Sequence, residues 1–183
     1  WDFYHLFPER FTNKTNGITP RRWMFYSNPQ LRELLDKKIG TSYQSNYKDF
    51  EKLMDFVDSK STQEEFLKIK HERKEILANY ILRNTGVHVD PDSIFDAQAK
   101  RLHAYKRQLL NIMQIIYRYE RIKEDPNYRM PKHTYIFAAK AASSYTFAKK
   151  VIKLINNVAN VVNNDPDVKD MIKVVFLPNY NVS

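Results

Sequence analysis

Cysteine is absent from the 183-residue chain, and glycine occurs only three times. Without cysteine the protein can form neither a disulfide framework nor a thiolate metal site. Gly17, Gly40 and Gly86 lie far apart, which argues against the glycine-rich turn that cradles phosphates in dinucleotide sites and P-loops. No apolar run approaches the roughly 20 residues that a membrane-spanning helix needs, and residues 1–20 lack the pattern of a signal peptide. We therefore expect a cytoplasmic protein with no membrane partner.

Basic residues outnumber acidic residues, with 30 Lys and Arg against 21 Asp and Glu and a formal net charge of +9. This balance favours anionic partners, such as phosphate-bearing ligands, nucleic acid or an acidic surface. Hydrophobic residues make up 43% of the chain and aromatic residues 14%, which indicates a packed interior. Because the chain begins at Trp1 rather than at methionine, we expect it to be a piece of a longer protein.

Residues 1–86 are predicted to form a mainly helical N-terminal segment. A helix is predicted over 29–39, because Asn28 can cap its start, Pro29 suits its first turn and Gly40 can end it.

Two further helices are predicted in the same segment. A short helix around 47–57 is one interpretation of an ambiguous stretch. A longer helix is predicted over 62–83, where Ser61 and Glu64 have the spacing of a capping box and Gly86 follows the last turn.

Residues 87–183 are predicted to form an α/β unit, because apolar runs of strand length alternate with amphipathic helices. The predicted strands are 93–99, 133–139 and 172–178, and the predicted helices are 104–123 and 145–163. This order implies right-handed crossovers and a partial Rossmann-like parallel sheet, which is an incomplete doubly wound half-domain. A sheet that ends here has at least one bare edge, so we expect missing strands downstream and a possible homo-oligomer that forms through an exposed sheet edge.

A cluster of cations lies where the first predicted strand meets the next helix. Lys100, Arg101, Lys106 and Arg107 fall at this junction. In open α/β sheets ligands collect at the carboxyl ends of strands, and a helix that starts near Ala104 would present its free N–H groups there. Cations in the first turn oppose the helix dipole, and a bound phosphate would reverse that cost. A solvated basic face without a ligand is the alternative. The five histidines have no metal-ligand spacing.

Several long stretches of the chain closely resemble the glycogen, starch and maltodextrin phosphorylases. In chain order they are "FPERFTNKTNGITPRRW", "FDAQAKRLHAYKRQLLN", "KHTYIFAAKAASSY", "VANVVNNDP" and "KVVFLPNYNVS". The resemblance implies the start of the C-terminal domain of a two-domain GT-B glycosyltransferase, the domain that carries pyridoxal 5′-phosphate. It also implies phosphorolysis, in which orthophosphate cleaves the terminal α-1,4 link of an α-glucan and releases glucose 1-phosphate with retained configuration.

The resemblance also assigns roles to individual residues. Lys100 is similar to the residue that contacts the cofactor phosphate, and Tyr180 to another neighbour of that phosphate. Arg101 and Lys106 resemble ligands of the substrate phosphate. Tyr105 and Asn16 resemble contacts to sugar hydroxyls.

The sequence also departs from the family's pattern. Ala104 stands where the animal enzymes carry a glutamate, and Asn181 where they carry an arginine near the cofactor phosphate. The lysine that binds the cofactor is expected beyond Ser183, so the 183-residue chain alone is predicted to hold no covalent cofactor and to be inactive. The alternatives are a stand-alone phosphate- or nucleic-acid-binding module, with nucleic acid the less favoured partner, and a GT-B transferase that uses sugar nucleotides.

Overall fold

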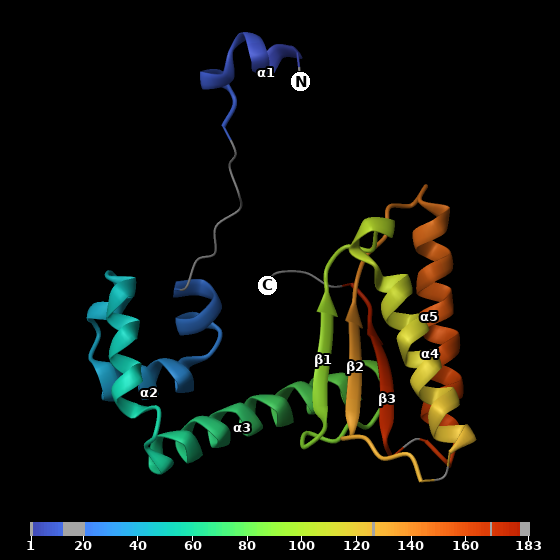
Figure 1. The fold of residues 1–183 in the computed structure, drawn as a ribbon. Helices are drawn as coiled ribbons and strands as arrows, with labels where there is room; N and C mark the ends of the chain where they lie inside the picture. Colours follow the sequence, from blue (N-terminus) through green and yellow to red (C-terminus); the bar gives the residue numbers. More distant parts are fainter. Residues whose placement is uncertain (1, 13–20, 126, 169, 180–183) are drawn as a thin grey trace. The chain divides into compact units, whose positions relative to one another are not determined.

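The structure of the chain is a computed structural model that describes residues 2–12, 21–125, 127–168 and 170–179. The helices are α1 (Asp2–Leu6), α2 (Pro29–Ile39), α3 (Lys60–Thr85), α4 (Gln108–Glu124) and α5 (Thr146–Asn164), and the strands are β1 (Ile94–Ala99), β2 (His133–Ala138) and β3 (Ile172–Leu177) (Figure 1). Short 3-10 helices lie at Pro8–Arg10, Ser42–Gln44, Tyr47–Phe56 and Ala104–Lys106, and a π-helix lies at Arg21–Tyr26. The chain forms two compact units, residues 1–69 and 70–183.

The caps of α2 in the first unit are those expected from the sequence. The Asn28 side chain accepts a hydrogen bond from the Leu31 N–H at 3.2 Å, which satisfies one of the free donors at the helix start. Gly40 follows the last residue with a φ of 72°, a conformation that glycine adopts without steric cost. The helix then buries Leu34, Leu35 and Ile39.

Tyr43 lies at the centre of the first unit's core, with 0% of its surface exposed. Its ring makes an edge contact with Phe25 at 5.3 Å between centroids and lies 4.9 Å from Phe50. Its hydroxyl donates to Asp36 Oδ1 at 2.7 Å, so the polar end of a buried side chain has a partner. Burial, followed by the hydrogen bond to Asp36, raises the pKa of Tyr43 to about 12.

The raised pKa of Tyr43 predicts a loss of stability at alkaline pH. The unfolded chain releases the phenolic proton near pH 10, whereas the folded unit keeps it, so stability falls as the pH rises from about 10 to about 12. Replacing Tyr43 with phenylalanine should remove this dependence and cost about 1 kcal/mol at neutral pH, because the hydrogen bond to Asp36 is lost. Urea unfolding followed by circular dichroism from pH 8 to 12 measures both effects. Equal alkaline slopes for the two proteins would contradict the assignment.

The start of α3 differs from the capping box predicted at Ser61. The helix begins at Lys60, and the N–H groups of Thr62 and Gln63 both donate to the Ser59 carbonyl, each at 3.0 Å. Ser61 therefore lies inside the first turn. The prediction was wrong because the helix begins one residue before Ser61, and helix ends are fixed less closely by a short sequence motif than by the backbone around them.

The second unit contains a three-stranded parallel sheet in the order β1-β2-β3, as the sequence predicts. β2 is the central strand, and Thr134 to Ala138 are all buried. Most residues of β1 are exposed, so the alternation expected for Phe95, Ala97 and Ala99 does not separate buried from exposed positions. The other edge strand, β3, is largely buried, so the exposure of β1 is decided by the packing around it rather than by its sequence pattern.

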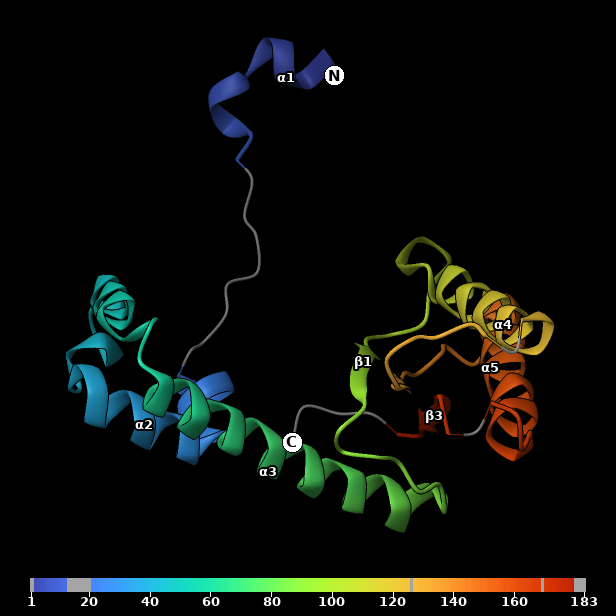
Figure 2. The ribbon, with the colours of Figure 1, turned by 60° about the horizontal axis from the view of Figure 1, so that its bottom comes forward.

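Helices cover both faces of this sheet, which gives the second unit three layers (Figure 2). Tyr135 and Phe137 of β2 pack into the main core with Ile112 and Ile115 of α4 and with residues of α5. On the other face, Ile136 packs in a second cluster with Ile81 of α3. The alternation of side chains along β2 therefore supplies both cores.

Asn163 of α5 occupies part of the β3 edge. Its Nδ2 donates to the Val174 carbonyl at 2.8 Å, and its Oδ1 accepts from the Val174 N–H at 2.9 Å. Both backbone groups of Val174 are thus paired with a side chain rather than with a strand. Pairing of a second sheet with β3 stays a prediction, and it would have to displace Asn163.

Candidate functional site

Eight residues, Lys100 to Arg107, connect β1 to α4 and carry four of the cations singled out above; we call this segment the cationic loop. Its start continues the sheet, because the Lys100 N–H donates to the Ala138 carbonyl and the Leu102 N–H to the Lys140 carbonyl, each at 3.0 Å. Leu102 is 3% exposed and belongs to the main core. Lys100 and Arg101 are therefore held at the carboxyl end of the sheet, where open α/β folds bind their ligands.

The cationic loop turns before α4 begins, which corrects the predicted helix start at Ala104. Residues Ala104–Lys106 form a 3-10 turn, and Arg107 adopts a left-handed conformation with φ 61° and ψ 31°. The α-helix starts only at Gln108. Lys106 consequently lies in the turn ahead of the helix and not in its first turn. A non-glycine residue with positive φ is strained, and such strain persists where the surrounding contacts fix the backbone.

The cations of the loop have no carboxylate partner among the residues that the structure describes. Lys100, Arg101 and Arg107 are exposed, and Lys106 is half-buried with its Nζ 5.7 Å from the centroid of the Tyr105 ring. Other cations of the same unit do have partners. Lys123 pairs with Asp167 at 2.6 Å and with Asp165 at 3.1 Å, and Lys132 pairs with Asp90 at 2.8 Å. The loop therefore keeps its positive charge available for an external anion.

The pKa shifts of the partnered groups follow from these ion pairs. Hydrogen bonds to Asp167 and Asp165 raise the pKa of Lys123 above its usual range. The hydrogen bond from Lys132 lowers the pKa of the Asp90 carboxyl, with help from the Asp92 backbone. Asp90 therefore stays ionised in the folded state at neutral pH and neutralises Lys132.

Two aromatic rings of the cationic loop cluster with a third from the start of α5. Tyr105 is 70% exposed, and its ring centroid lies 4.2 Å from that of His103. The His103 ring also lies 5.1 Å from the ring of Tyr145, the residue that precedes α5. These side chains offer a flat surface and hydroxyl groups next to the positive charges, a combination suited to a sugar phosphate.

The structure places four of the six candidate site residues on this one loop: Lys100, Arg101, Tyr105 and Lys106. Asn16 and Tyr180 lie outside the described residues, as does Asn181. Lys140 lies just after β2, and its carbonyl accepts the hydrogen bond from the Leu102 N–H of the loop, but it is not among the residues predicted from the sequence. Its position directly after an apolar strand run was the signal available.

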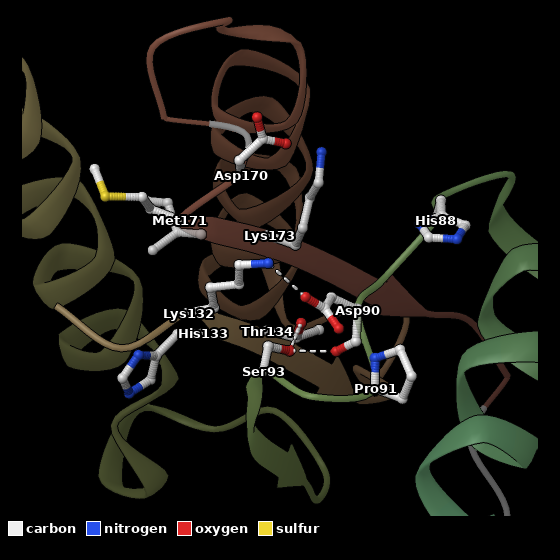
Figure 3. Close-up of a pocket in the computed structure, with 11 residues that line it drawn as sticks. His88, Asp90, Pro91, Ser93, Lys132, His133, Thr134, Asp170, Met171 and Lys173 are labelled. Atoms are coloured by element: carbon white, nitrogen blue, oxygen red, sulfur yellow. Dashed lines mark hydrogen bonds and ion pairs between the residues drawn. The ribbon is translucent and has the colours of Figure 1, made fainter.

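A separate pocket of about 260 Å³ lies at the amino ends of the strands (Figure 3). Lys132 and Asp90 form an ion pair across it, and the buried hydroxyls of Ser93 and Thr134 lie 2.7 Å apart. Ser93 also donates to the Asp90 carbonyl at 2.6 Å. Because these groups satisfy one another, we interpret the network as a structural connection between the loop before β1 and the start of β2.

Two classes of site are not found in the part of the chain that the structure describes. It contains no group of three or more His, Cys, Asp or Glu side chains placed to hold a metal ion. Within the same residues, no helix has the length and apolar character needed to cross a membrane.

Comparison with known proteins gives a match along the whole chain. The family model for carbohydrate phosphorylases matches residues 1–183. A glycogen phosphorylase of Synechocystis is 50% identical over 181 residues, which cover 99% of this chain and 21% of that protein. A glycogen phosphorylase of Bacillus subtilis is 50% identical over 182 residues, and the muscle form of Oryctolagus cuniculus is 47% identical over 182 residues; these cover 100% of this chain and 23% and 22% of those proteins. The chain thus spans about a fifth of the length of these relatives.

Proposed function

Since the chain belongs to the carbohydrate phosphorylase family, and within it to the α-glucan phosphorylases, we propose that it is the part of such an enzyme that binds phosphate. The complete enzyme uses orthophosphate to remove terminal glucosyl units from an α-1,4-glucan such as glycogen or maltodextrin, and it releases glucose 1-phosphate. The observation that carries the proposal is the cationic loop, whose charges lie at the carboxyl end of the sheet without carboxylate partners among the described residues.

Arg101 and Lys106 would bind the substrate phosphate. Arginine offers a planar fork of donors that can bind two phosphate oxygens, and lysine adds a point charge. Held in this way, the phosphate stays close to the anomeric carbon as the glycosidic bond breaks. Positive charge that develops on the glucosyl ring is then balanced by the bound phosphate, and for this reason cations serve here instead of the carboxylate pair of glycosidases.

Tyr105 and Asn16 are the proposed contacts to sugar hydroxyls. Tyr105 fits this role because its exposed ring lies next to Lys106, so a hydroxyl donor and a phosphate ligand are neighbours. Hydrogen bonds to the glucosyl unit would fix its orientation relative to the phosphate.

The cationic loop also fits the phosphate group of pyridoxal 5′-phosphate. Two phosphates side by side need more than one cation, and the loop provides Lys100 in addition to Arg101 and Lys106. Lys100 would hold the cofactor phosphate, with Tyr180 as a second contact. When bound, the cofactor supplies a phosphate that exchanges a proton with the substrate phosphate. The chain's own residues bind and orient both anions.

The proposal is tested by measuring glucose 1-phosphate formation with the full-length protein, maltodextrin, orthophosphate and added pyridoxal 5′-phosphate. We expect phosphorolysis by the full-length protein and none by the 183-residue chain, which spans 21–23% of the relatives' length. If the full-length protein forms no glucose 1-phosphate, the proposed function is wrong. If the 183-residue chain alone forms it, the proposed inactivity is wrong.

Two further features remain proposals. One is the division of the chain into a helical junction segment, residues 1–86, and a half-domain, residues 87–183.

The other is a homo-oligomer that forms through an exposed sheet edge. Light scattering over a tenfold concentration range measures its mass, and a monomeric mass throughout that range would contradict the proposal.

A further inference from the structure

Two glutamines next to the cationic loop hold its backbone with neutral groups. Gln108 is the first residue of α4, and only 1% of its surface is exposed. Its Nε2 donates to the Arg101 carbonyl at 3.1 Å, and its Oε1 accepts from the His103 N–H at 3.4 Å. One buried amide therefore connects the start of α4 to two backbone groups in the first half of the loop.

Gln98 holds the other half of the loop in the same way. Its Nε2 donates from β1 to the Lys106 carbonyl at 3.1 Å. Its Oε1 accepts from Asn111 Nδ2 of α4 at 3.0 Å, which fixes the orientation of the Gln98 amide. The two glutamines thus fix the backbone before the 3-10 turn and at its last residue, and the Tyr145 hydroxyl adds a further contact by accepting from the Ala104 N–H at 3.3 Å.

The chemistry of these contacts suits a loop that must keep its charge. Four cations within eight residues repel one another, so the loop needs contacts that resist its opening. Carboxylates could supply such contacts, but they would pair with the cations and compete with a bound phosphate. Amides and a phenol hold the backbone and leave the positive charge unchanged.

We propose that Gln108 and Gln98 are positioning residues of the phosphate site, which they serve by fixing the backbone that carries Arg101 and Lys106. This inference rests on the proposed function. A shift of about 1 Å in a positioned group can reduce catalysis by about 100-fold, so loss of these contacts should affect phosphate use before it affects anything else.

The test compares Gln108→Met, Gln98→Met and Gln114→Met in the full-length protein. Methionine is close to glutamine in length and suits a buried site, but it cannot make the two amide hydrogen bonds. Gln114 is the matched control, because it lies on the same helix, its amide oxygen is placed to accept from Arg118, and no hydrogen bond joins it to the backbone of the loop among the described residues. For Gln108→Met we expect the KM for orthophosphate to rise about tenfold, with a much smaller change in the KM for maltodextrin. Gln114→Met should change neither value.

Hydrogen exchange provides a readout that does not depend on activity. Peptides that cover residues 100–107 should exchange faster in Gln108→Met and Gln98→Met, while peptides of β2 and α5 keep their wild-type rates. If Gln108→Met does not fold, Gln98→Met decides the question with the same two measurements. Unchanged phosphate KM and unchanged loop exchange would overturn the inference while leaving phosphorolysis in place. If the wild-type protein shows no phosphorolysis, the proposed function is wrong. In that case hydrogen exchange alone tests the inference, and it is overturned if residues 100–107 exchange at the wild-type rate in both glutamine variants.

Discussion

Replacing Arg101 with leucine in the full-length protein is expected to lower kcat/KM for orthophosphate by about 100- to 1,000-fold. A loss of this size is typical when a preorganised group that stabilises developing charge in the transition state is removed. Leucine retains the apolar part of the side chain and removes the guanidinium. The backbone carbonyl that Gln108 binds stays in place, so the loop should keep its conformation. Initial rates of glucose 1-phosphate release at varied orthophosphate concentration measure the effect.

Arg83→Leu is the matched control for Arg101→Leu. Arg83 is an exposed arginine near the end of α3, and the change removes the same charge from the same unit. Its effect on kcat/KM should stay within about twofold, as for other surface substitutions. The control also separates the proposed function from the alternative of a polyanion-binding module. If the two replacements reduce affinity for nucleic acid equally and phosphorolysis is absent, scattered charge rather than a phosphate site explains the basic composition.

Replacing Phe137 with alanine is expected to destabilise the second unit by about 3–5 kcal/mol. Phe137 lies on the central strand β2, with 1% of its surface exposed, in the core that α4 and α5 cover. Removing the ring leaves a cavity that close-packed neighbours fill only in part. Folded domains are stable by only about 5–15 kcal/mol, so the variant should lose a large share of its stability. Urea unfolding at neutral pH measures the change.

Phe147→Ala is the control for the core substitution. Phe147 lies on α5, but 39% of its surface is exposed and its ring lies 6.0 Å from the ring of Tyr145. The same change in side-chain volume should cost about 1 kcal/mol or less there, since less apolar surface returns to water. If the two variants lose similar amounts of stability, Phe137 does not pack in the core between β2 and the helices α4 and α5.

Much of the second unit could be predicted from periodicity. The apolar runs of β2 and β3 and the stripes of α4 and α5 indicate strand, helix and strand, and this order implies parallel pairing. In the first unit, Asn28, Pro29 and Gly40 define α2 because each has a local chemical role that depends on a few neighbouring residues. Such features are local, so the sequence carries them completely.

The start of α4 could not be predicted in this way. From Ala104 onward the sequence has no helix breaker, yet the helix begins at Gln108. Burial of Leu102 in the core and the amides of Gln98 and Gln108 fix the loop backbone in a 3-10 turn and a left-handed residue. These contacts join residues from separate elements, and tertiary contacts override a weak local preference.

The sequence by itself determined the alternation of strands and helices, the parallel sheet and the family to which the chain is similar. Only the tertiary structure decided which cations keep their charge free. Lys123 and Lys132 are as basic in the sequence as Lys100, but the fold brings each of them to an aspartate about 40 residues away in the chain. Ion pairing depends on distances of a few ångströms between distant residues, and sequence spacing does not fix those distances.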